Sequence, residues 1–410
     1  MNHLRTLNRL LLFRNILEDK LLAEMMTVES HTGEYSTAAK LIEKAEKVGL
    51  SGDLVKEYIF YLLANGDNVF SRTAERNGAK LGDGLLRAAG HDIVVLREFL
   101  QQEMNIFTEN VMHDYQPTGA VKNRSIYDIK KYFTDAGIPA DEAAKGLCGH
   151  YRRYGYGILA DYMAFKWDEK AGSLVGISSC DDITFDSIVG YERQKQELID
   201  NTKAFLQGLP ANNVLLYGQR GTGKSSSIKA LVNTFFADGL RLVQVSRYQF
   251  IHLPAIMSTL KNWGKKFILC LDDLSFEEFE VEYKQLKSIL DGGLEAKPDN
   301  VLIYATSNRR NIIKEVWADN EGDELHRTDT INEKVSLSDR FGLKIFFISP
   351  SQDEYFTIVK ELAARYKLGL SDVELKQEAV KWEMTHTGRS GRVAEQLVTY
   401  LAGRNKNDGK

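Results

Sequence analysis

The feature that most constrains this chain is a glycine-rich loop at residues 218–225, with the sequence Gly-Gln-Arg-Gly-Thr-Gly-Lys-Ser. It fits the pattern G-x-x-x-x-G-K-S/T, follows the apolar run Val214–Tyr217 and precedes a segment of helical periodicity. Glycines let the backbone curl so that successive N–H groups point at one anion at the start of a helix. The loop therefore predicts a binding site for the phosphates of a nucleotide, formed by Gly218, Gly221, Thr222, Gly223, Lys224, Ser225 and Ser226.

Lysine, serine and aspartate residues in and after this loop indicate which side chains would bind the phosphates and which would bind a metal ion. We expect Lys224 to reach the β- and γ-phosphates and Ser225 to supply a hydroxyl ligand to Mg²⁺. A second apolar run, Phe267–Leu271, ends in Asp272 and Asp273, at the sheet edge where α/β folds bind ligands. Asp272 is the expected partner of Mg²⁺, directly or through water, and Asp273 can orient or deprotonate an attacking water.

Short apolar runs alternate with helical segments between residues 213 and 348. The runs are Val214–Tyr217, Leu242–Val245, Phe267–Leu271, Val301–Ala305 and Phe346–Ile348. Most are continuous apolar strings, which are typical of strands buried on both faces of a parallel sheet, and the segments between them are long enough for crossover helices. The sequence therefore predicts an α/β fold with a parallel five-stranded sheet and flanking helices.

Helical patterns precede and follow this region. Apolar positions at spacings of three and four indicate helices at Asp53–Leu63, Asp92–Gln102, Ser125–Ala136 and Asp141–Tyr154, and an amphipathic helix over Leu7–Leu21. Downstream, Ser275 with Glu278, Ser351 with Glu354, and Ser371 with Glu374 are spaced as capping boxes, and a last helix follows Gly391. We predict three domains: a mostly α-helical N-terminal domain at 1–182, a nucleotide-binding domain at 183–350 and a helical lid at 351–410.

Three further polar features follow in order along the chain. Asn308 ends the strand that begins at Val301, where an amide can hold the attacking water near the γ-phosphate. Arg340 stands just before the last strand, and Arg392 opens the final helix. With the two earlier motifs, this series resembles an AAA+ ATPase module over residues 186–402. Segments 210–218, 272–277 and 305–310 resemble, more narrowly, a bacterial branch known mainly as a domain of unknown function described as an ATP-binding protein.

The resemblance assigns the conserved roles of AAA+ proteins to residues of this chain. It implies Walker A at 218–225, Walker B at 267–273, sensor 1 at Asn308, an arginine finger at Arg340 and sensor 2 at Arg392. It also implies that the segment containing Val189 and Gly190 lines the adenine pocket. The nucleotide would lie between subunits of a homo-oligomer, so that Arg340 reaches the γ-phosphate of a neighbour while Arg392 acts within its own chain.

One departure from the family pattern concerns the catalytic base. Most AAA+ modules end Walker B in Asp-Glu, whereas this chain has Asp272-Asp273, with Glu277 one helical turn on as an alternative base. We therefore expect slow or partner-stimulated hydrolysis.

The predicted function is Mg²⁺-dependent ATP hydrolysis coupled to assembly or to remodelling of a partner. The alternative is an ATP-gated loader or scaffold with little hydrolysis. No Asn-Lys-x-Asp string supports guanine binding, and no acceptor-binding lid inside the sheet domain supports a small-molecule kinase.

Composition limits the partners and the compartment. With 43% hydrophobic and 27% charged residues, the 410-residue chain has the composition of a soluble globular protein, and its net charge of −4 argues against indiscriminate nucleic-acid binding. The three cysteines, Cys148, Cys180 and Cys270, have neither disulfide nor zinc-site spacing, which favours a reducing cytoplasm. No apolar run is long enough for a signal peptide or a membrane span. We expect an unidentified protein partner to bind the N-terminal domain.

Three segments keep alternative interpretations. The amphipathic helix at Leu7–Leu21 packs on its own domain or binds a membrane surface or a partner helix. The aromatic and basic stretch Tyr151–Tyr156 is ordinary packing or a stacking surface for nucleic acid. The acidic stretch 319–334 is a solvated loop or an insertion that contacts an effector or a neighbouring subunit.

Overall fold

The computed structural model describes residues 6–27, 31–78, 80–102, 107, 112–118, 124–178, 181–274, 281–290, 297–308, 337–386 and 388–408. The chain divides into two compact units, Met1–Tyr162 with Trp263–Lys265, and Met163–Asn262 with Lys266–Lys410. The two units are therefore described separately. Within the described ranges, every helix is too short or too polar to cross a membrane.

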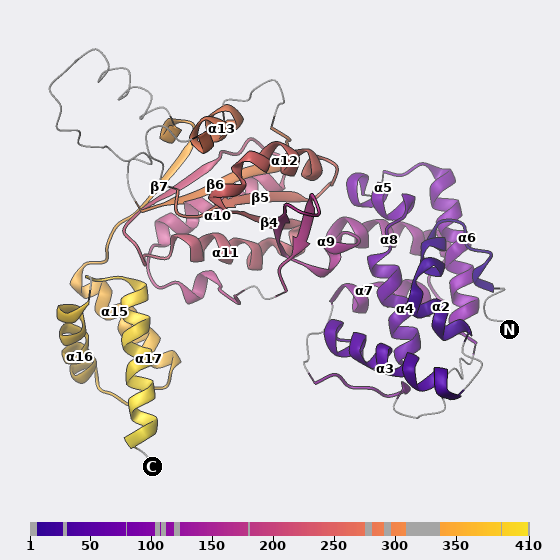
Figure 1. Ribbon diagram of the computed structural model, residues 1–410, viewed down its shortest axis with the longest axis horizontal. Helices are drawn as coiled ribbons and strands as arrows, with labels where there is room; N and C mark the ends of the chain where they lie inside the picture. Colours follow the sequence, from indigo (N-terminus) through magenta and orange to yellow (C-terminus); the bar gives the residue numbers. More distant parts are fainter. Residues whose placement is uncertain are drawn as a thin grey trace. The chain divides into compact units, whose positions relative to one another are not determined.

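The first unit is helical, as predicted (Figure 1). Its elements are η1 (Phe13–Glu18), α2 (Lys20–Thr27), α3 (His31–Val48), α4 (Leu54–Asn65), α5 (Val69–Asn77), α6 (Asp83–Leu100), α7 (Arg124–Thr134), α8 (Ala140–Tyr154) and α9 (Ile158–Asp161). Helix α8 packs against α5, α6 and α7, and its apolar face, which includes Leu147 and Tyr151, is buried in the core. The four helices that the spacing of apolar residues predicts in this region are confirmed as α4, α6, α7 and α8.

The prediction of one amphipathic helix over Leu7–Leu21 is wrong. The chain instead forms the short 3₁₀ helix η1, and α2 begins only at Lys20. The cause is the buried carboxylate of Asp92, which accepts the backbone N–H groups of Leu11, Leu12 and Phe13 at 2.7–3.1 Å. Groups that donate to a side chain cannot also donate within a helix. Most apolar side chains of this segment nevertheless pack in the unit's own core, whereas Leu11 is exposed.

Residues Trp263–Lys265 belong to the first unit, although they connect α12 and β5 of the second unit along the chain. The Lys265 ammonium is buried and lies 3.8 Å from Glu75 Oε1. It also donates to the carbonyl oxygen of Tyr151 at 3.3 Å, and the N–H of Gly264 donates to Glu75 Oε2 at 2.7 Å. The chain therefore enters the first unit a second time, immediately before β5, the strand that Asp272 follows.

The second unit contains a seven-stranded sheet with the strand order β2-β1-β4-β5-β6-β3-β7. The strands are β1 (Ala164–Asp168), β2 (Ser173–Gly176), β3 (Val214–Gly218), β4 (Leu240–Val245), β5 (Lys266–Leu271), β6 (Val301–Ser307) and β7 (Leu343–Phe347). The five strands that the sequence predicts are confirmed and are parallel to one another. The structure adds a hairpin at one edge, in which β1 is parallel to β4 and β2 is antiparallel to β1. The predicted domain boundaries at 182/183 and 350/351 stay predictions.

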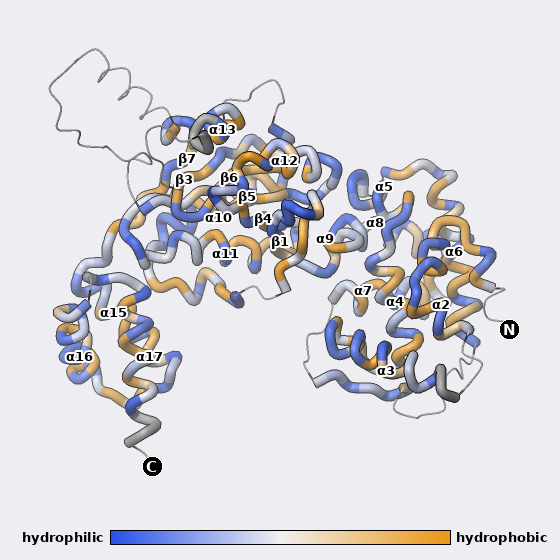
Figure 2. Tube along the Cα trace, viewed as in Figure 1, coloured by the Kyte–Doolittle hydropathy of each residue, from blue (hydrophilic) through white to orange (hydrophobic). Residues whose placement is uncertain are grey.

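Helices cover both faces of this sheet (Figure 1). On one face, α10 (Glu192–Leu206) and α11 (Lys224–Phe235) pack against side chains of the central strands. On the other, α12 (Leu253–Lys261) follows the 3₁₀ helix η5 (Arg247–His252) and contacts β6, and α13 (Val281–Leu290) contacts η5. The short 3₁₀ helices η3 (Phe185–Ser187) and η4 (Phe236–Asp238) precede α10 and β4. The central strands carry hydrophobic residues almost without interruption (Figure 2), as two-sided burial requires.

Three helices form the C-terminal part: α15 (Gln352–Arg365), α16 (Asp372–Thr385) and α17 (Gly391–Asp408). They enclose a small core of their own, against which Val189 also packs. Both capping boxes predicted here are confirmed, because Ser351 and Glu354, and Ser371 and Glu374, exchange their side-chain and backbone hydrogen bonds. The box predicted at 275 and 278 lies outside the described residues.

Two of the three cysteines lie within the described residues. Cys148 and Cys270 are both buried with unoxidised thiols, and burial raises the pKa of the Cys148 thiol to about 11 and that of Cys270 to about 12. The thiolate is the reactive form, so both side chains act as packing residues. Cys180 lies outside the described residues.

Candidate functional site

The predicted phosphate-binding loop connects β3 to α11, at the carboxyl edge of the sheet. Gly218 has φ +136°, and a Cβ there would lie 2.1 Å from the carbonyl oxygen of Phe347 on β7. Gly221 has φ +77°, and a Cβ there would lie 2.7 Å from Ser390 Oγ. Side chains at these two positions would therefore prevent β7 and the segment that leads into α17 from lying so close to the phosphate-binding loop.

Lys224 begins α11 and is buried beneath the loop. Its ammonium donates to the carbonyl oxygens of Gly218 at 2.9 Å and Gln219 at 2.7 Å, and to Asn308 Oδ1 at 3.2 Å. Burial lowers the pKa of Lys224, an effect that the carboxylates of Asp273 and Asp272 oppose. The cation is thus held by contacts from the phosphate loop and from the residue that follows β6.

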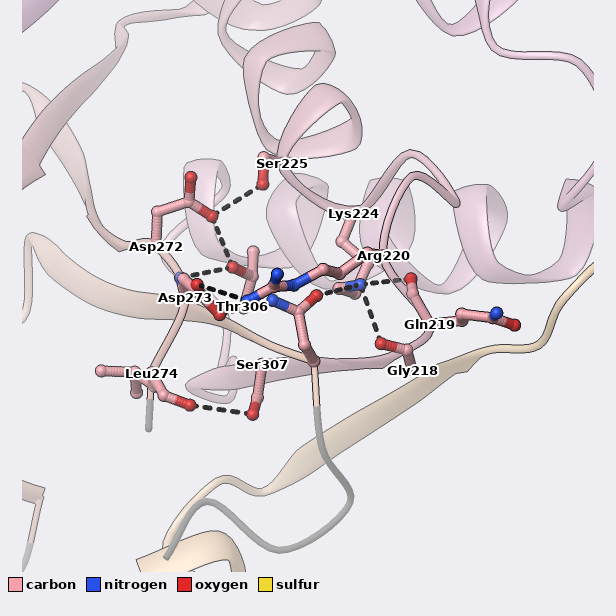
Figure 3. Close-up of polar contacts among 11 residues, drawn as sticks. Gly218, Gln219, Arg220, Lys224, Ser225, Asp272, Asp273, Leu274, Thr306 and Ser307 are labelled. Atoms are coloured by element: carbon pink, nitrogen blue, oxygen red, sulfur yellow. Dashed lines mark hydrogen bonds and ion pairs between the residues drawn. The ribbon is translucent and has the colours of Figure 1, made fainter. Parts of the chain in front are cut away.

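Ser225 and Asp272 provide the oxygen donors that the sequence predicts for Mg²⁺. Ser225 Oγ donates to Asp272 Oδ1 at 2.7 Å, and Thr306 Oγ1 donates to the same oxygen at 2.5 Å (Figure 3). Nowhere in the described part of the chain could three or more His, Cys, Asp or Glu side chains hold a metal ion. One hydroxyl and one carboxylate fit Mg²⁺, which keeps most of its coordination for water and phosphate oxygens.

Asp273 follows with its backbone in the left-handed region, at φ +54°. Its N–H donates to Thr306 Oγ1 at 2.9 Å, its Oδ1 accepts from Asn308 Nδ2 at 2.5 Å, and its Oδ2 lies 3.8 Å from Arg220 Nη2. Figure 3 shows Arg220 of the phosphate loop, Asp273 after β5 and Thr306 of β6 close together. The structure therefore brings together Lys224, Ser225, Asp272, Asp273 and Asn308, which the sequence predicts as one site.

A cleft of about 860 Å³ contains these groups. Predicted residues that line it are Val189, Gly221, Thr222, Gly223, Lys224, Ser225, Ser226, Asp272, Asp273, Asn308 and Arg392. Away from the carboxylates, Ile188 and Val189 together with Ile358 and Leu362 of α15 give it an apolar part. Gly190 lies in the turn beside Val189, with φ +76°, and is not among the described lining residues.

Arg340 does not join this site within the chain. It precedes β7, and the first residue of β7, Leu343, pairs with Val214, the first residue of β3, whereas the phosphate loop follows the last residue of β3. Arg340 is accordingly absent from the described residues that line the cleft. Its role on a neighbouring subunit stays a prediction. Glu277 and the acidic stretch 319–334 lie outside the described residues.

Three residues of the site were not identified from the sequence. Arg365 of α15 lines the cleft and donates to the carbonyl oxygens of Asp186 at 2.6 Å and Ser187 at 2.8 Å, in the segment before α10. Arg220 occupies a variable position of the loop pattern, and Thr306 stands in a buried strand. Only Thr306 carried a signal, as part of the polar end of that strand.

Residues 160–405 match the family described as Protein of unknown function (DUF815). The chain is similar in structure to the Holliday junction branch migration motor RuvB of Thermotoga maritima, with 17% identity over 53% of this chain and 63% of RuvB and a TM-score of 0.37. Two single-residue variants of that RuvB match at 17% identity, 53% of this chain and 63% and 64% of theirs, with TM-scores of 0.37 and 0.38.

The aligned region spans less than two thirds of the RuvB chains. Curated proteins provide no match. The family match covers well over half of the 410 residues, including the whole sheet and nearly all of the C-terminal helices. The chain therefore belongs to the DUF815 family.

Proposed function

We propose that this chain binds Mg·ATP in the cleft beneath α15 and α17 and hydrolyses it to ADP and phosphate. The observation that carries the proposal is one connected set of hydrogen bonds. Asn308 accepts from Lys224 and donates to Asp273, so the group suited to the γ-phosphate and the group suited to an attacking water are 3.2 and 2.5 Å from the same amide. A merely structural glycine turn has no need of this convergence.

Each residue has a distinct part in the proposed reaction. The cation of Lys224 and the loop N–H groups bind the phosphates, and Ser225 and Asp272 hold Mg²⁺. Mg²⁺ supplies neutralisation of the charge that develops on the phosphate oxygens. Asp273 accepts a proton from water while Asn308 orients that water. The water oxygen bonds to the γ-phosphorus as the bond between that phosphorus and the β–γ bridging oxygen breaks, and ADP leaves.

The C-terminal helices are placed to respond to the nucleotide. The N–H of Arg392, at the start of α17, donates to the carbonyl oxygen of Gly221 at 3.3 Å. Because Arg392 lines the same cleft, its guanidinium is available to the phosphates of its own chain. A change at the phosphate loop would therefore alter the contact that seats α17.

An ATP-gated binding module with slow hydrolysis is the second candidate. The observation that favours it is that Asp273 is shorter than the glutamate usual at this position, and that its carboxylate already accepts the Asn308 amide at 2.5 Å and lies 3.8 Å from Arg220. In either case we propose a cytoplasmic homo-oligomer with nucleotide at its subunit interfaces. The first unit would carry the protein partner, since Trp263–Lys265 belongs to that unit and leads directly into β5.

The test is phosphate release from ATP as a function of protein concentration. Wild-type turnover should rise more than linearly with concentration if the site is completed by a neighbour, and Asp273→Asn and Arg340→Ala should each abolish it. ATP that binds tightly but is not hydrolysed at any concentration favours the binding module. Lys224→Ala that binds Mg·ATP as tightly as wild type would refute the assignment of the cleft altogether.

Partners can be tested with the same Asp273→Asn variant, which should hold ATP and retain whatever protein it engages. A nucleic-acid role predicts ATP-dependent binding that weakens steeply with salt. Binding that does not change between low and physiological salt would leave the protein partner as the only proposal.

A further inference from the structure

Thr306, the sixth residue of β6, contacts the end of β5 through both its side chain and its backbone. Its hydroxyl donates to Asp272 Oδ1 at 2.5 Å and accepts from the Asp273 N–H at 2.9 Å. Its carbonyl oxygen accepts the N–H of Leu274 at 2.7 Å. One residue therefore binds three consecutive residues of the neighbouring segment, two of which are the carboxylates of the site.

Sheet register explains why this residue is in reach. Leu271, the last residue of β5, pairs with Ala305 of β6. The next residue after each of these two is Asp272 and Thr306, which therefore lie side by side. Thr306 is buried, with 2% of its surface exposed, and so its hydroxyl is shielded from competing water. A single hydroxyl can donate one hydrogen bond and accept others, and here the donated one goes to a carboxylate, the stronger kind of acceptor.

The turn that Thr306 holds is unfavourable by itself. Asp273 has φ +54°, a region in which a residue with a Cβ is uncommon and costs about 1 kcal/mol or more. The bonds from Thr306 to the Asp273 and Leu274 N–H groups stabilise this conformation. The conformation in turn points Asp272 toward Ser225 (Figure 3). It also brings the Asp273 carboxylate within 2.5 Å of the Asn308 amide.

We infer that Thr306 is a positioning residue of the hydrolytic centre, which orients the Mg²⁺ carboxylate and the base carboxylate through one hydroxyl. The inference rests on the proposed function. The Thr306 hydroxyl donates to a carboxylate, whereas the hydroxyl of the next residue, Ser307, donates to the Leu274 carbonyl oxygen at 2.9 Å. Ser307 supports the same turn from an equally buried position, through its bond to Leu274.

The test compares Thr306→Val, which removes the hydroxyl and keeps the shape, with Thr306→Ser, which keeps the hydroxyl. Ser307→Ala is the matched control, because it removes one hydrogen bond of the same turn. Thr306→Val should lower kcat by about 10- to 100-fold, the usual effect of removing a group that orients a metal ligand. Thr306→Ser should retain kcat within about threefold, and Ser307→Ala should do the same.

Binding separates positioning from a general loss of structure. The affinity for ATP is measured by calorimetry in Mg²⁺ and again in EDTA, and the ratio of the two affinities reports the coupling between metal and nucleotide. Thr306→Val should reduce this ratio about tenfold and leave the affinity in EDTA unchanged. The melting temperature of each variant is recorded alongside.

Each outcome has a definite meaning. If Thr306→Val keeps both the wild-type kcat and the wild-type Mg²⁺ ratio, or if Ser307→Ala reduces them as much, Thr306 is not a positioning residue. If Thr306→Val also loses affinity in EDTA, the hydroxyl supports the fold of the cleft and not the carboxylates alone, and the inference is again wrong. A wild-type chain that binds and hydrolyses no ATP contradicts the proposed function instead.

Discussion

The buried carboxylate of Asp92 should hold the N-terminal segment of the first unit in place. It accepts the N–H groups of Leu11, Leu12 and Phe13, and one of its oxygens, Oδ2, contacts all three at 2.7–3.1 Å. Asp92→Asn replaces one carboxylate oxygen by an NH₂ group, which cannot accept. With its one oxygen in the place of Oδ2, the asparagine can still accept the three N–H groups, but these hydrogen bonds are no longer made to a charged group.

A hydrogen bond to a charged group contributes about 1 kcal/mol more than a neutral one, so the loss over three bonds is about 3 kcal/mol. Opening of the segment that contains η1 should then become about 100-fold more frequent, since 1.4 kcal/mol corresponds to a factor of ten. The segment carries an exposed arginine, Arg14, at which trypsin cleaves. When opening and closing are fast relative to cleavage, the cleavage rate follows the population of the open form.

The assay is therefore limited proteolysis of the full chain with trypsin, in which the band cut at Arg14 is followed by mass. Asp92→Asn should accelerate this cut about 100-fold, and cuts in the C-terminal helices should keep their rates. Asp67→Asn is the matched control, because Asp67 lies in the same unit and forms an exposed ion pair with Arg72. An unchanged rate at Arg14 in Asp92→Asn would show that the three N–H groups do not depend on this carboxylate.

Three further predictions concern pH, nucleotide affinity and assembly. Burial lowers the pKa of His150 to about 3, below its unfolded value of about 6.5, so the folded state binds fewer protons and this group's contribution to stability falls as the pH drops below 6.5. Wild type should lose about 2 kcal/mol more than His150→Gln between pH 7 and pH 5 in urea denaturation, and equal losses would contradict this. Arg365→Ala should weaken ATP and ADP binding alike by about tenfold in calorimetry, because its two hydrogen bonds hold a segment that lines the cleft; a loss confined to ATP would be inconsistent. Lys224→Ala and Arg340→Ala chains, each inactive alone, should recover phosphate release when mixed, and no recovery would argue against a finger acting between subunits.

The parts of the fold that the sequence predicts correctly depend on local patterns. Runs such as Phe267–Leu271 are apolar at every position, which only a strand buried on both faces requires. Ser351 and Glu354 are three residues apart and satisfy each other's backbone groups, so their capping box needs no tertiary partner. The phosphate loop is likewise contiguous, and its glycines have the positive φ angles that the pattern implies.

The parts that the sequence does not predict depend on distant residues. The Asp92 carboxylate interrupts helical bonding about 80 positions earlier in the chain, and nothing near Leu11 indicates this. The hairpin of β1 and β2 was missed because its strands are short and lie at the edge, with charged residues such as Lys166 among the apolar ones. Thr306 acquires its contacts only from the register of β6 on β5, which a single sequence does not specify.

These distant contacts also limit how the proposed reaction can be controlled. Thr306 lies near the end of β6 and Asn308 directly follows that strand, and between them they contact Lys224, Asp272 and Asp273. A displacement of this strand end by the length of one hydrogen bond would therefore break its contacts with all three groups at once: the phosphate-binding cation, the metal-binding carboxylate and the base. If the proposed function is correct, this strand end is the place where a single displacement would regulate hydrolysis. A partner or neighbouring subunit that shifts it would change the rate of turnover without touching the phosphate loop itself.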